Sequence, residues 1–398
     1  MGIRKLDSSN YSTENMSETI PRFGVKSPSV SLYSTDDPVD KLYLVLVPLV
    51  SSAGVAFPKT SELPRSLTYG DNVLNGLANW NSLSQKLQCI PGFRTALIPN
   101  DIYGQLHEVG AVFFSLTEGM HSNSKKSSVS QNFPSFPGIL GSLFNCFLSG
   151  LRVSSVNSAV FNIKVGEGSL IKKSRDGRNL AQSLKSAFKC MQINTSFFLT
   201  DLSQPIGRAL GNSLEIREAI EILKGSGPLD LLKLALELGS DMLLFADKTM
   251  SKGEAKDILK KKILSGDGLK KFREIIQAQE GDTRIIDNDS LLPFSEKRYE
   301  IRSFKTGFIQ KIKTRKLYSV YLKCVAQERK QTGSGNRGIG FVLQKQSGDW
   351  VKKGESLVEV HLNSKVSRSW TEAEFQEIFL ISDTPPPFQP LIIERIKD

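Results

Sequence analysis

Few residues of this chain combine the side-chain type and the spacing that catalysis or metal binding requires. The three histidines have no Cys, Asp or Glu partner at metal-ligand spacing, and we interpret them as surface residues: His107, His121 and His361. The four cysteines lie far apart and form no CxxC pair, which argues against a zinc site or a disulfide framework and fits a reducing compartment. The run Gly333-Ser-Gly-Asn-Arg-Gly338 has the letters of a GxGxxG loop, but it joins no strand to a helix, so we interpret it as a flexible loop.

The most strongly patterned segment is 200–244, which predicts a glycine loop followed by two helices. Asn212 stands where an N-cap would, and Glu215 three residues later completes the pattern of a capping box. Pro228 fits the first turn of the second helix, and Gly239 fits its C-cap. On pattern alone these are two core helices.

The bulk composition is that of an ordinary globular protein. The chain has 398 residues, of which 39% are hydrophobic and 23% are charged, enough for two or three domains. The sequence contains no run of about 18 apolar residues, so it predicts no membrane helix. The first 25 residues are rich in Ser and Thr, lack the apolar core of a secretory signal and indicate a flexible arm, so we expect a cytoplasmic protein.

The net charge of +11 permits an acidic partner, but the basic residues are dispersed along the chain. No aromatic residues interleave with them as in an RNA-binding sheet. We therefore do not expect nucleic-acid binding, and we keep a basic scaffold in a nucleoprotein complex as an alternative that salt-dependent retention of RNA or DNA would reveal.

The order of the elements indicates a mostly parallel sheet with helices between its strands. Segments 156–165 and 195–200 predict strands, and 175–190 predicts a helix, whereas the apolar run 41–50 fits either a buried strand or a helix. Beyond Pro293 the pattern changes to short strands and turns, which indicates a second domain.

The segments 203–221 and 224–231 resemble the thymidine phosphorylase / pyrimidine-nucleoside phosphorylase family, and the resemblance extends over about 30–398. It implies an α/β fold: a three-layer, mostly parallel sheet domain of the nucleoside phosphorylase type with a smaller C-terminal α+β domain. The expected organisation is a flexible arm (1–25), a central α/β domain (26–118 and 151–293), a loop and remnant of the family's helical domain (119–150), and the C-terminal domain (294–398).

The resemblance implies a phosphate site, which is degenerate in this chain. The family loop Lys-His-Ser-Thr-Gly-Gly-Val-Gly-Asp corresponds to 32–40, where Ser34, Thr35 and Asp40 match. All three glycines are absent: Asp36 and Asp37 replace two of them, and Pro38 follows. Two aspartates would repel a phosphate dianion, and a proline has no amide donor. The start of the second phosphate segment matches Lys59, Thr60 and Ser61, but its glycines are absent.

The base-binding positions that the resemblance implies are also altered. An arginine of the family corresponds to Ser127, and its serine and lysine correspond to Ser142 and Cys146. Family members can hold a monovalent cation with two carbonyls and a glutamate, matching Ile206, Ala209 and Glu218. Lys41 falls among the remaining ligands and brings a positive charge, so we expect no bound metal, and the resemblance implies no other cofactor.

These substitutions predict a degenerate relative of the family that has lost catalysis and acts by binding. Phosphate and a pyrimidine nucleoside would bind weakly at most, and a protein partner is expected. The alternative is a working phosphorylase in which Lys59 or Lys125 replaces the missing groups. Dimerisation stays open, because the helical bundle through which the family pairs is mostly absent here.

Overall fold

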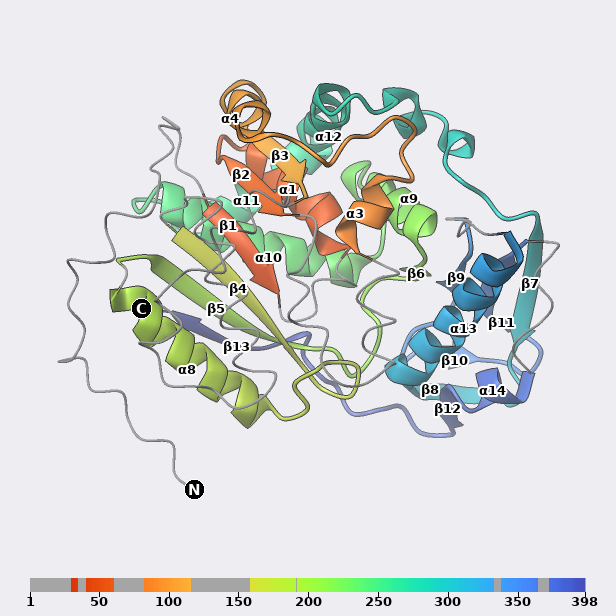
Figure 1. Ribbon diagram of the computed structural model, residues 1–398. Coiled ribbons are helices and arrows are strands. Elements are labelled where there is room, and N and C mark those ends of the chain that lie inside the picture. Colours follow the sequence, from red (N-terminus) through yellow and green to blue (C-terminus); the bar gives the residue numbers. More distant parts are fainter. Residues whose placement is uncertain are drawn as a thin grey trace.

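The computed structural model describes residues 30–34, 41–60, 82–115, 158–190, 192–332, 338–363 and 372–397. These residues form a large α/β body and a smaller body of strands around one long helix (Figure 1). The expected arm at 1–25 and the segment 119–150 lie outside the described residues. Within the described part of the chain, no helix has the length and apolar character needed to cross a membrane.

The large body is built on a four-stranded sheet with the order β1-β4-β5-β13. Its strands are β1 (Val30–Ser34), β4 (Ser158–Val165), β5 (Asn194–Asp201) and β13 (Ile392–Lys397). The first three run parallel, and β13 lies antiparallel to β5. The predicted strands and the mostly parallel α/β class are therefore confirmed.

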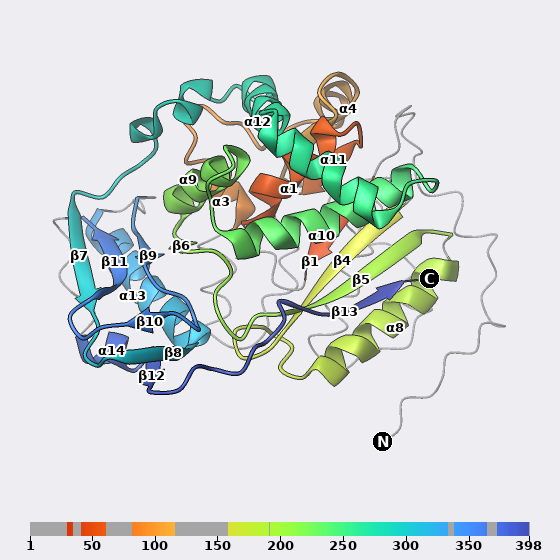
Figure 2. The ribbon, with the colours of Figure 1, turned by 180° about the vertical axis from the view of Figure 1, so that it is seen from behind.

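Helices cover both faces of this sheet and make three layers (Figure 2). Helix α8 (Ser174–Cys190) packs on one face against alternate residues of β4, such as Phe161 and Ile163. The opposite face carries Val160 and packs against the larger helical layer. That layer contains the helices α1 (Leu42–Ser52), α3 (Leu83–Leu87), α4 (Pro99–Glu108), α9 (Asn212–Leu223), α10 (Leu229–Ala246), α11 (Lys252–Leu264) and α12 (Asp267–Ala278).

The apolar run 41–50 is a helix, which settles the strand-or-helix alternative. Every residue of α1 from Leu42 to Ser51 is buried, because α9, α10, α11 and α12 surround it. A helix that is apolar on all sides loses the amphipathic signal by which sequence distinguishes it from a strand. A two-stranded parallel sheet of β2 (Phe57–Thr60) and β3 (Ala111–Phe114) lies beside it.

Two of the expected helix ends in 200–244 are wrong. The N-cap of α9 is Gly211 with φ of 132°, and Asn212 is its first residue; Glu215 still accepts a hydrogen bond from the Gly211 amide at 3.0 Å. Gly239 lies inside α10, which continues to Ala246. A Cβ on Gly239 would come within 3.0 Å of Leu46, so this glycine serves close packing on α1 and not helix termination.

The smaller body has its own core and two sheets, ordered β6-β9-β11-β7 and β10-β8-β12. Its elements are β7 (Lys297–Arg302), β8 (Gly307–Ile312), α13 (Thr314–Thr332), β9 (Gly340–Leu343), β10 (Trp350–Val351), β11 (Ser356–Leu362), α14 (Glu372–Gln376) and β12 (Phe379–Ser382). Two short 3₁₀ helices, Thr283–Ile286 and Asp289–Leu291, precede it.

The two bodies exchange strands. Strand β6 (Ala209–Leu210), which leads into α9 of the large body, pairs with β9 of the small one. In return, the chain leaves the small body after β12 and adds β13 to the edge of the large sheet. The small body is therefore tied to the large one at both of its ends, and β13, which belongs to the expected segment 294–398, lies in the large sheet.

Candidate functional site

Polar side chains gather at the carboxyl ends of β1 and β5 and at Asn162 of the strand β4 between them. Ser34, the last residue of β1, is in register with Asn162 of β4, and both side chains are buried. The Thr200 hydroxyl of β5 donates to Asn162 Oδ1 at 2.7 Å. Among the described residues, Ser34 Oγ and Asn162 Nδ2 have no hydrogen-bond partner. Open α/β sheets bind ligands at this edge, so it is the candidate site.

The structure places only part of the expected phosphate site at this edge. Ser34 lies there, whereas Lys59 lies on β2 of the neighbouring two-stranded sheet. The Lys59 side chain is 2% exposed, and its ammonium stands 3.8 Å from the centroid of the Tyr43 ring. A cation on an aromatic face is stabilised there. The backbone of Thr60 ends β2, and its side chain, together with Thr35 and Ser61, lies outside the described residues.

The base-binding positions cannot be placed, because Ser127, Ser142 and Cys146 also lie outside the described part of the chain. The aspartates and the proline of the first loop are in the same situation. The two residues that flank this loop are described: Ser34 ends β1, and Lys41 is the N-cap of α1.

The expected cation site is a compact group in which Lys41 takes part. The Lys41 ammonium contacts a Glu218 carboxylate oxygen and donates to the Ala209 carbonyl at 2.6 Å. The other Glu218 oxygen accepts the amides of Arg208 at 2.5 Å and Ala209 at 2.8 Å. Both charged side chains are less than a tenth exposed. Ile206 packs against the main core beside this group.

Gly207 leaves the space that the Lys41 side chain fills. Its φ is 70°, and a Cβ there would come within 2.7 Å of both Lys41 Nζ and Glu218 Oε2. The Gly207 amide donates to Asp230 Oδ2 at 2.8 Å, which holds the loop in place. The residues expected for a metal therefore do not fit one: a second cation at the Glu218 carboxylate would meet the Lys41 ammonium at contact distance.

The sequence did not predict a second buried ion pair. Lys86 of α3 is fully buried, and its ammonium lies 3.3 Å from Glu215 Oε2 of α9. The pKa of Tyr321 of α13 is raised well above its ordinary value, mainly because the side chain is buried and secondly because the Glu215 carboxylate is near. The Glu215 position was visible only as a capping residue, and nothing in the local sequence around Lys86 indicates that it is buried.

The histidines were interpreted as surface residues, and for His361 this is wrong. Its side chain is 7% exposed on the central strand β11, and its Nε2 lies 2.7 Å from Glu359 Oε1. Burial lowers the pKa of His361, and the Arg298 and Arg217 cations add to this, while Glu359 opposes it. His107 is exposed, and His121 lies outside the described residues.

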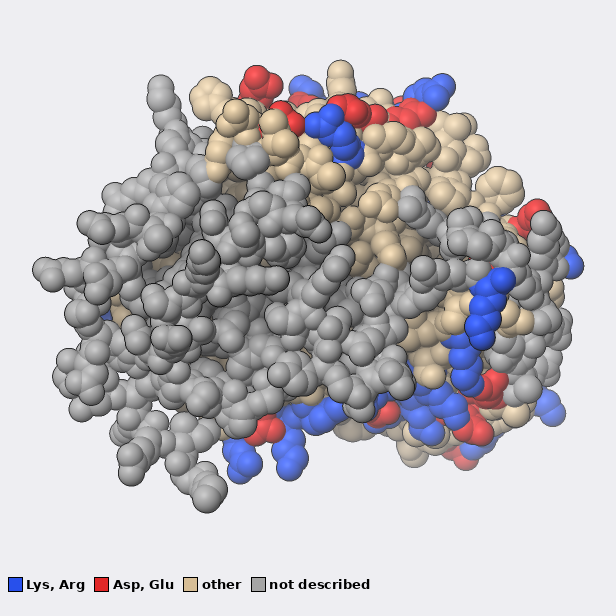
Figure 3. All heavy atoms as spheres, in the orientation of Figure 1, with Lys and Arg blue, Asp and Glu red and all other residues tan. Residues whose placement is uncertain are grey.

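The charged groups of one face are unevenly distributed. In Figure 3, Lys and Arg gather along the lower margin beside α8 and the small body, and acidic and basic groups alternate along the upper margin. Lysines elsewhere are engaged internally, as Lys41, Lys59 and Lys86 are. Lys41 and Lys86 each face a buried glutamate, so the charges of these two lysines are balanced inside the protein.

Comparison with known proteins identifies relatives of this chain. No family model matches it. It is 28% identical over 379 residues to a pyrimidine-nucleoside phosphorylase of Geobacillus stearothermophilus, which covers 95% of this chain and 84% of that protein. It is also 28% identical over 349 residues to a pyrimidine-nucleoside phosphorylase of Staphylococcus haemolyticus, covering 88% of this chain and 78% of that protein.

Among solved structures, the anthranilate phosphoribosyltransferase of Thermus thermophilus is similar to this one, with a TM-score of 0.46 and 12% identity over 63% of this chain and 78% of that one. The layered sheet, the small strand-exchanging body and the sequence relatives define an α/β protein of the nucleoside phosphorylase type. Within that class, the chain is a divergent relative of the pyrimidine-nucleoside phosphorylases, as the resemblance in its sequence predicts.

Proposed function

We propose that this chain is a pseudoenzyme of the pentosyltransferase class, which keeps the phosphorylase fold, does not catalyse phosphorolysis and acts as a binding or structural protein. The observation that carries the proposal is the sequence after Ser34, where Asp36 and Asp37 stand in place of two glycines and Pro38 follows them. The resemblance assigns these positions to glycines whose amides hold phosphate, and a phosphate dianion needs such donors, whereas aspartates repel it.

The surroundings of the two described phosphate-site side chains support the same proposal. Lys59 is buried against Tyr43, and Ser34 is 1% exposed. Losing one donor that stabilises charge in a transition state typically costs about 10²–10³ in rate. Several such losses together leave phosphorolysis near the uncatalysed background.

One observation favours the alternative, a working phosphorylase with a rearranged site. Ser34 Oγ and Asn162 Nδ2 are buried polar atoms without a partner among the described residues, at the edge where a substrate would bind. Buried polar groups are normally satisfied, so a ligand there would gain two hydrogen bonds.

The deciding experiment is a turnover assay on the purified full-length chain. Thymidine or uridine would be incubated with phosphate, and the free base would be measured against the Geobacillus stearothermophilus enzyme as positive control. We expect less than one base released per protein molecule and no rise in melting temperature with phosphate or nucleoside. Multiple turnovers would support the rearranged site and reject the pseudoenzyme, whereas stabilisation by either substrate without turnover would show binding alone.

A further inference from the structure

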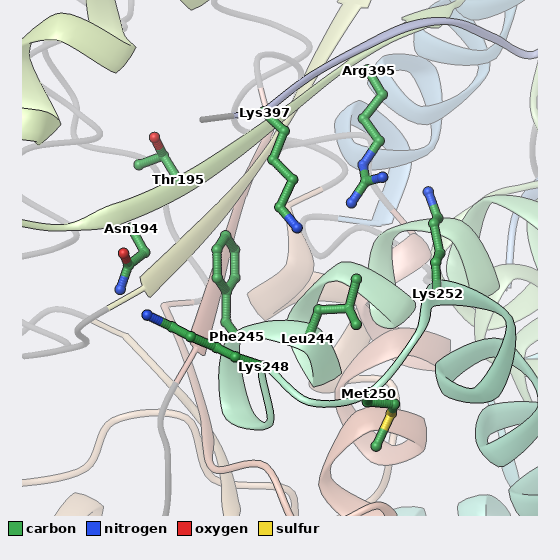
Figure 4. A pocket seen from close by; sticks show the side chains of 9 residues that line it. All are labelled: Asn194, Thr195, Leu244, Phe245, Lys248, Met250, Lys252, Arg395 and Lys397. Carbon is green, nitrogen blue, oxygen red and sulfur yellow. The ribbon is translucent and has the colours of Figure 1, made fainter.

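A second concave site lies at the opposite edge of the main sheet. It is a pocket of about 510 Å³ where β5 begins, α10 ends and β13 passes (Figure 4). Its described lining consists of Asn194, Thr195, Leu244, Phe245, Lys248, Met250, Lys252, Arg395 and Lys397. Along β5, Thr195 of the pocket lies five residues before Thr200 of the carboxyl edge, which is about 16 Å at roughly 3.3 Å per residue, and the two sites share no residue. The volume is that of a small-molecule site.

The pocket carries only positive formal charge on its described lining. Four of the residues are cationic, Lys248, Lys252, Arg395 and Lys397, and none is acidic. Arg395 and Lys397 reach the same side because alternate residues of a strand share a face, and Figure 4 shows both extending from β13 toward the end of α10. A concave surface lined by one sign of charge concentrates the electrostatic potential.

Two of these cations are held in place by a buried carboxylate behind them. Asp241 is 1% exposed, its Oδ2 accepts a hydrogen bond from Arg395 Nε at 2.8 Å, and its Oδ1 lies 2.6 Å from Arg395 Nη2. Lys252 Nζ lies 3.5 Å from the same carboxylate and 3.0 Å from Glu237 Oε2. This support fixes Arg395 and Lys252, whose side chains are 27% exposed, at the wall of the pocket.

The other two cations have no such partner. Neither the Lys248 nor the Lys397 ammonium makes an ion pair or hydrogen bond with any described residue. Thr195 is 2% exposed, and its hydroxyl also lacks a partner within the described part of the chain. The pocket thus offers two free ammonium groups and one buried free hydroxyl, all of which can donate to an anion.

The rest of the lining is apolar. Leu244, Phe245 and Met250 are partly exposed where the main core reaches the surface. An aromatic ring and a thioether beside cations can hold a flat ring through stacking and sulfur contacts. An inorganic anion alone would leave this apolar surface uncovered.

We propose that this pocket binds a small organic phosphate that carries a flat ring, of the size of a mononucleotide, with the phosphate at Lys248 and Lys397 and the ring against Phe245. The site is independent of the carboxyl edge. It therefore stands whether or not the chain catalyses phosphorolysis.

Calorimetric titration of the full chain with adenosine monophosphate tests the proposal, with adenosine and inorganic phosphate as partial probes. We expect saturable binding of the monophosphate that weakens as salt is added, and weaker binding of either partial probe. The double substitution Lys248→Gln with Lys397→Gln should weaken the monophosphate by about tenfold or more, since charge-assisted hydrogen bonds are the strong ones.

The matched control is Lys189→Gln with Lys353→Gln, which removes the same charge from exposed positions elsewhere and should change the affinity less than about twofold. Phe245→Leu should weaken the monophosphate and leave inorganic phosphate unchanged. Melting temperatures would confirm that each variant is folded. No saturable binding, an unaffected lysine double variant, an equal loss in the control, or inorganic phosphate binding as tightly as the monophosphate would each overturn the proposal.

Discussion

At the scale of single residues, Lys41 is the most informative side chain of the molecule. Its ammonium stands between the Ala209 carbonyl and the Glu218 carboxylate, the groups that the family resemblance assigns to a cation. A tethered ammonium supplies the positive charge that Glu218 requires when buried. The structural need for a free cation is thereby met by the chain itself.

Replacing Lys41 should show that the buried Glu218 carboxylate requires a cation. Lys41→Met leaves the Glu218 carboxylate buried without its cation, and we expect a loss of about 3–5 kcal/mol in the free energy of unfolding. Urea titrations would measure it in potassium chloride and in choline chloride. The parent chain should be equally stable in both salts, whereas the variant should regain part of its stability with potassium.

The exposed lysine substitution Lys270→Met serves as the control and should change stability by less than about 0.5 kcal/mol. A Lys41→Met variant as stable as the parent would show that Glu218 finds its compensation elsewhere.

His361 gives the molecule a pH dependence with a defined sign. Its pKa is lowered in the folded state by burial, despite Glu359, with Arg298 and Arg217 contributing. The unfolded chain, with an ordinary pKa of about 6.5, then binds the proton more readily, so stability is full above that pH and falls as the pH drops. Between about pH 7 and pH 5, the parent should lose more stability than His361→Gln, as measured by urea unfolding at each pH. Parallel curves would contradict this.

At the scale of elements, Gln279 joins the end of α12 to the edge of β3. Its side chain donates to the Phe113 and Arg94 carbonyls, each at 2.7 Å, and accepts the Phe113 amide at 3.0 Å. The Gln105 amide also donates to Gln279 at 3.3 Å. The glutamine thus takes the place of a neighbouring strand beside a two-stranded sheet, whose edge would otherwise have unpaired backbone groups.

Removing these bonds should be costly. Gln279→Met fills a similar volume but leaves the buried Phe113 amide and carbonyl unpaired, and we expect a loss of about 2–4 kcal/mol. Chemical unfolding would measure it, with the exposed Gln277→Met, two residues earlier, as the matched control. Equal stability of the two variants would mean that water replaces the side-chain bonds.

The elements also explain how far the sequence alone could predict this molecule. Strand 156–165 was predictable because apolar and polar residues alternate along it, and 195–200 because it is a short segment of Thr, Ser, Phe and Leu before a glycine loop. The sequence of 41–50 fits a strand or a helix equally well because α1 is buried on every side. Gly239 was wrongly predicted as a C-cap because it allows close contact with another helix and does not end its own. Ser34 was identified as a candidate residue from its motif, but its position at the end of β1 was not predicted. Lys59 under Tyr43, Lys86 with Glu215 and the basic pocket depend on contacts between distant segments, which no local pattern encodes.

At the scale of the whole molecule, the strand exchange makes the two bodies interdependent. Strand β6 enters the small body and β13 returns to the large one, so the small body is held at both ends. The buried Glu215, between Lys86 of the large body and Tyr321 of the small one, lies where they meet. We therefore expect the two bodies to unfold together in one transition and not separately.

Deletion of β13 tests this coupling. A chain ending at residue 390 loses the backbone pairing along β5, the Arg395 partner of the buried Asp241 and the Ile396 contact with the α8 face. It also leaves β5 as an open edge, which favours association with other chains. We expect the melting temperature of the whole molecule to fall by about 10 °C or more. Each kcal/mol lost from the free energy of unfolding lowers the melting temperature by roughly 4–8 °C in a small domain and by about half that in a larger one.

Glu394→Gln is the control, because it breaks only the half-exposed ion pair with Arg178. It should lower the free energy of unfolding by less than about 1 kcal/mol. Calorimetry would distinguish the outcomes: if the small body of the truncated chain melts at its original temperature while only the large body is destabilised, the two bodies are independent despite the exchanged strands.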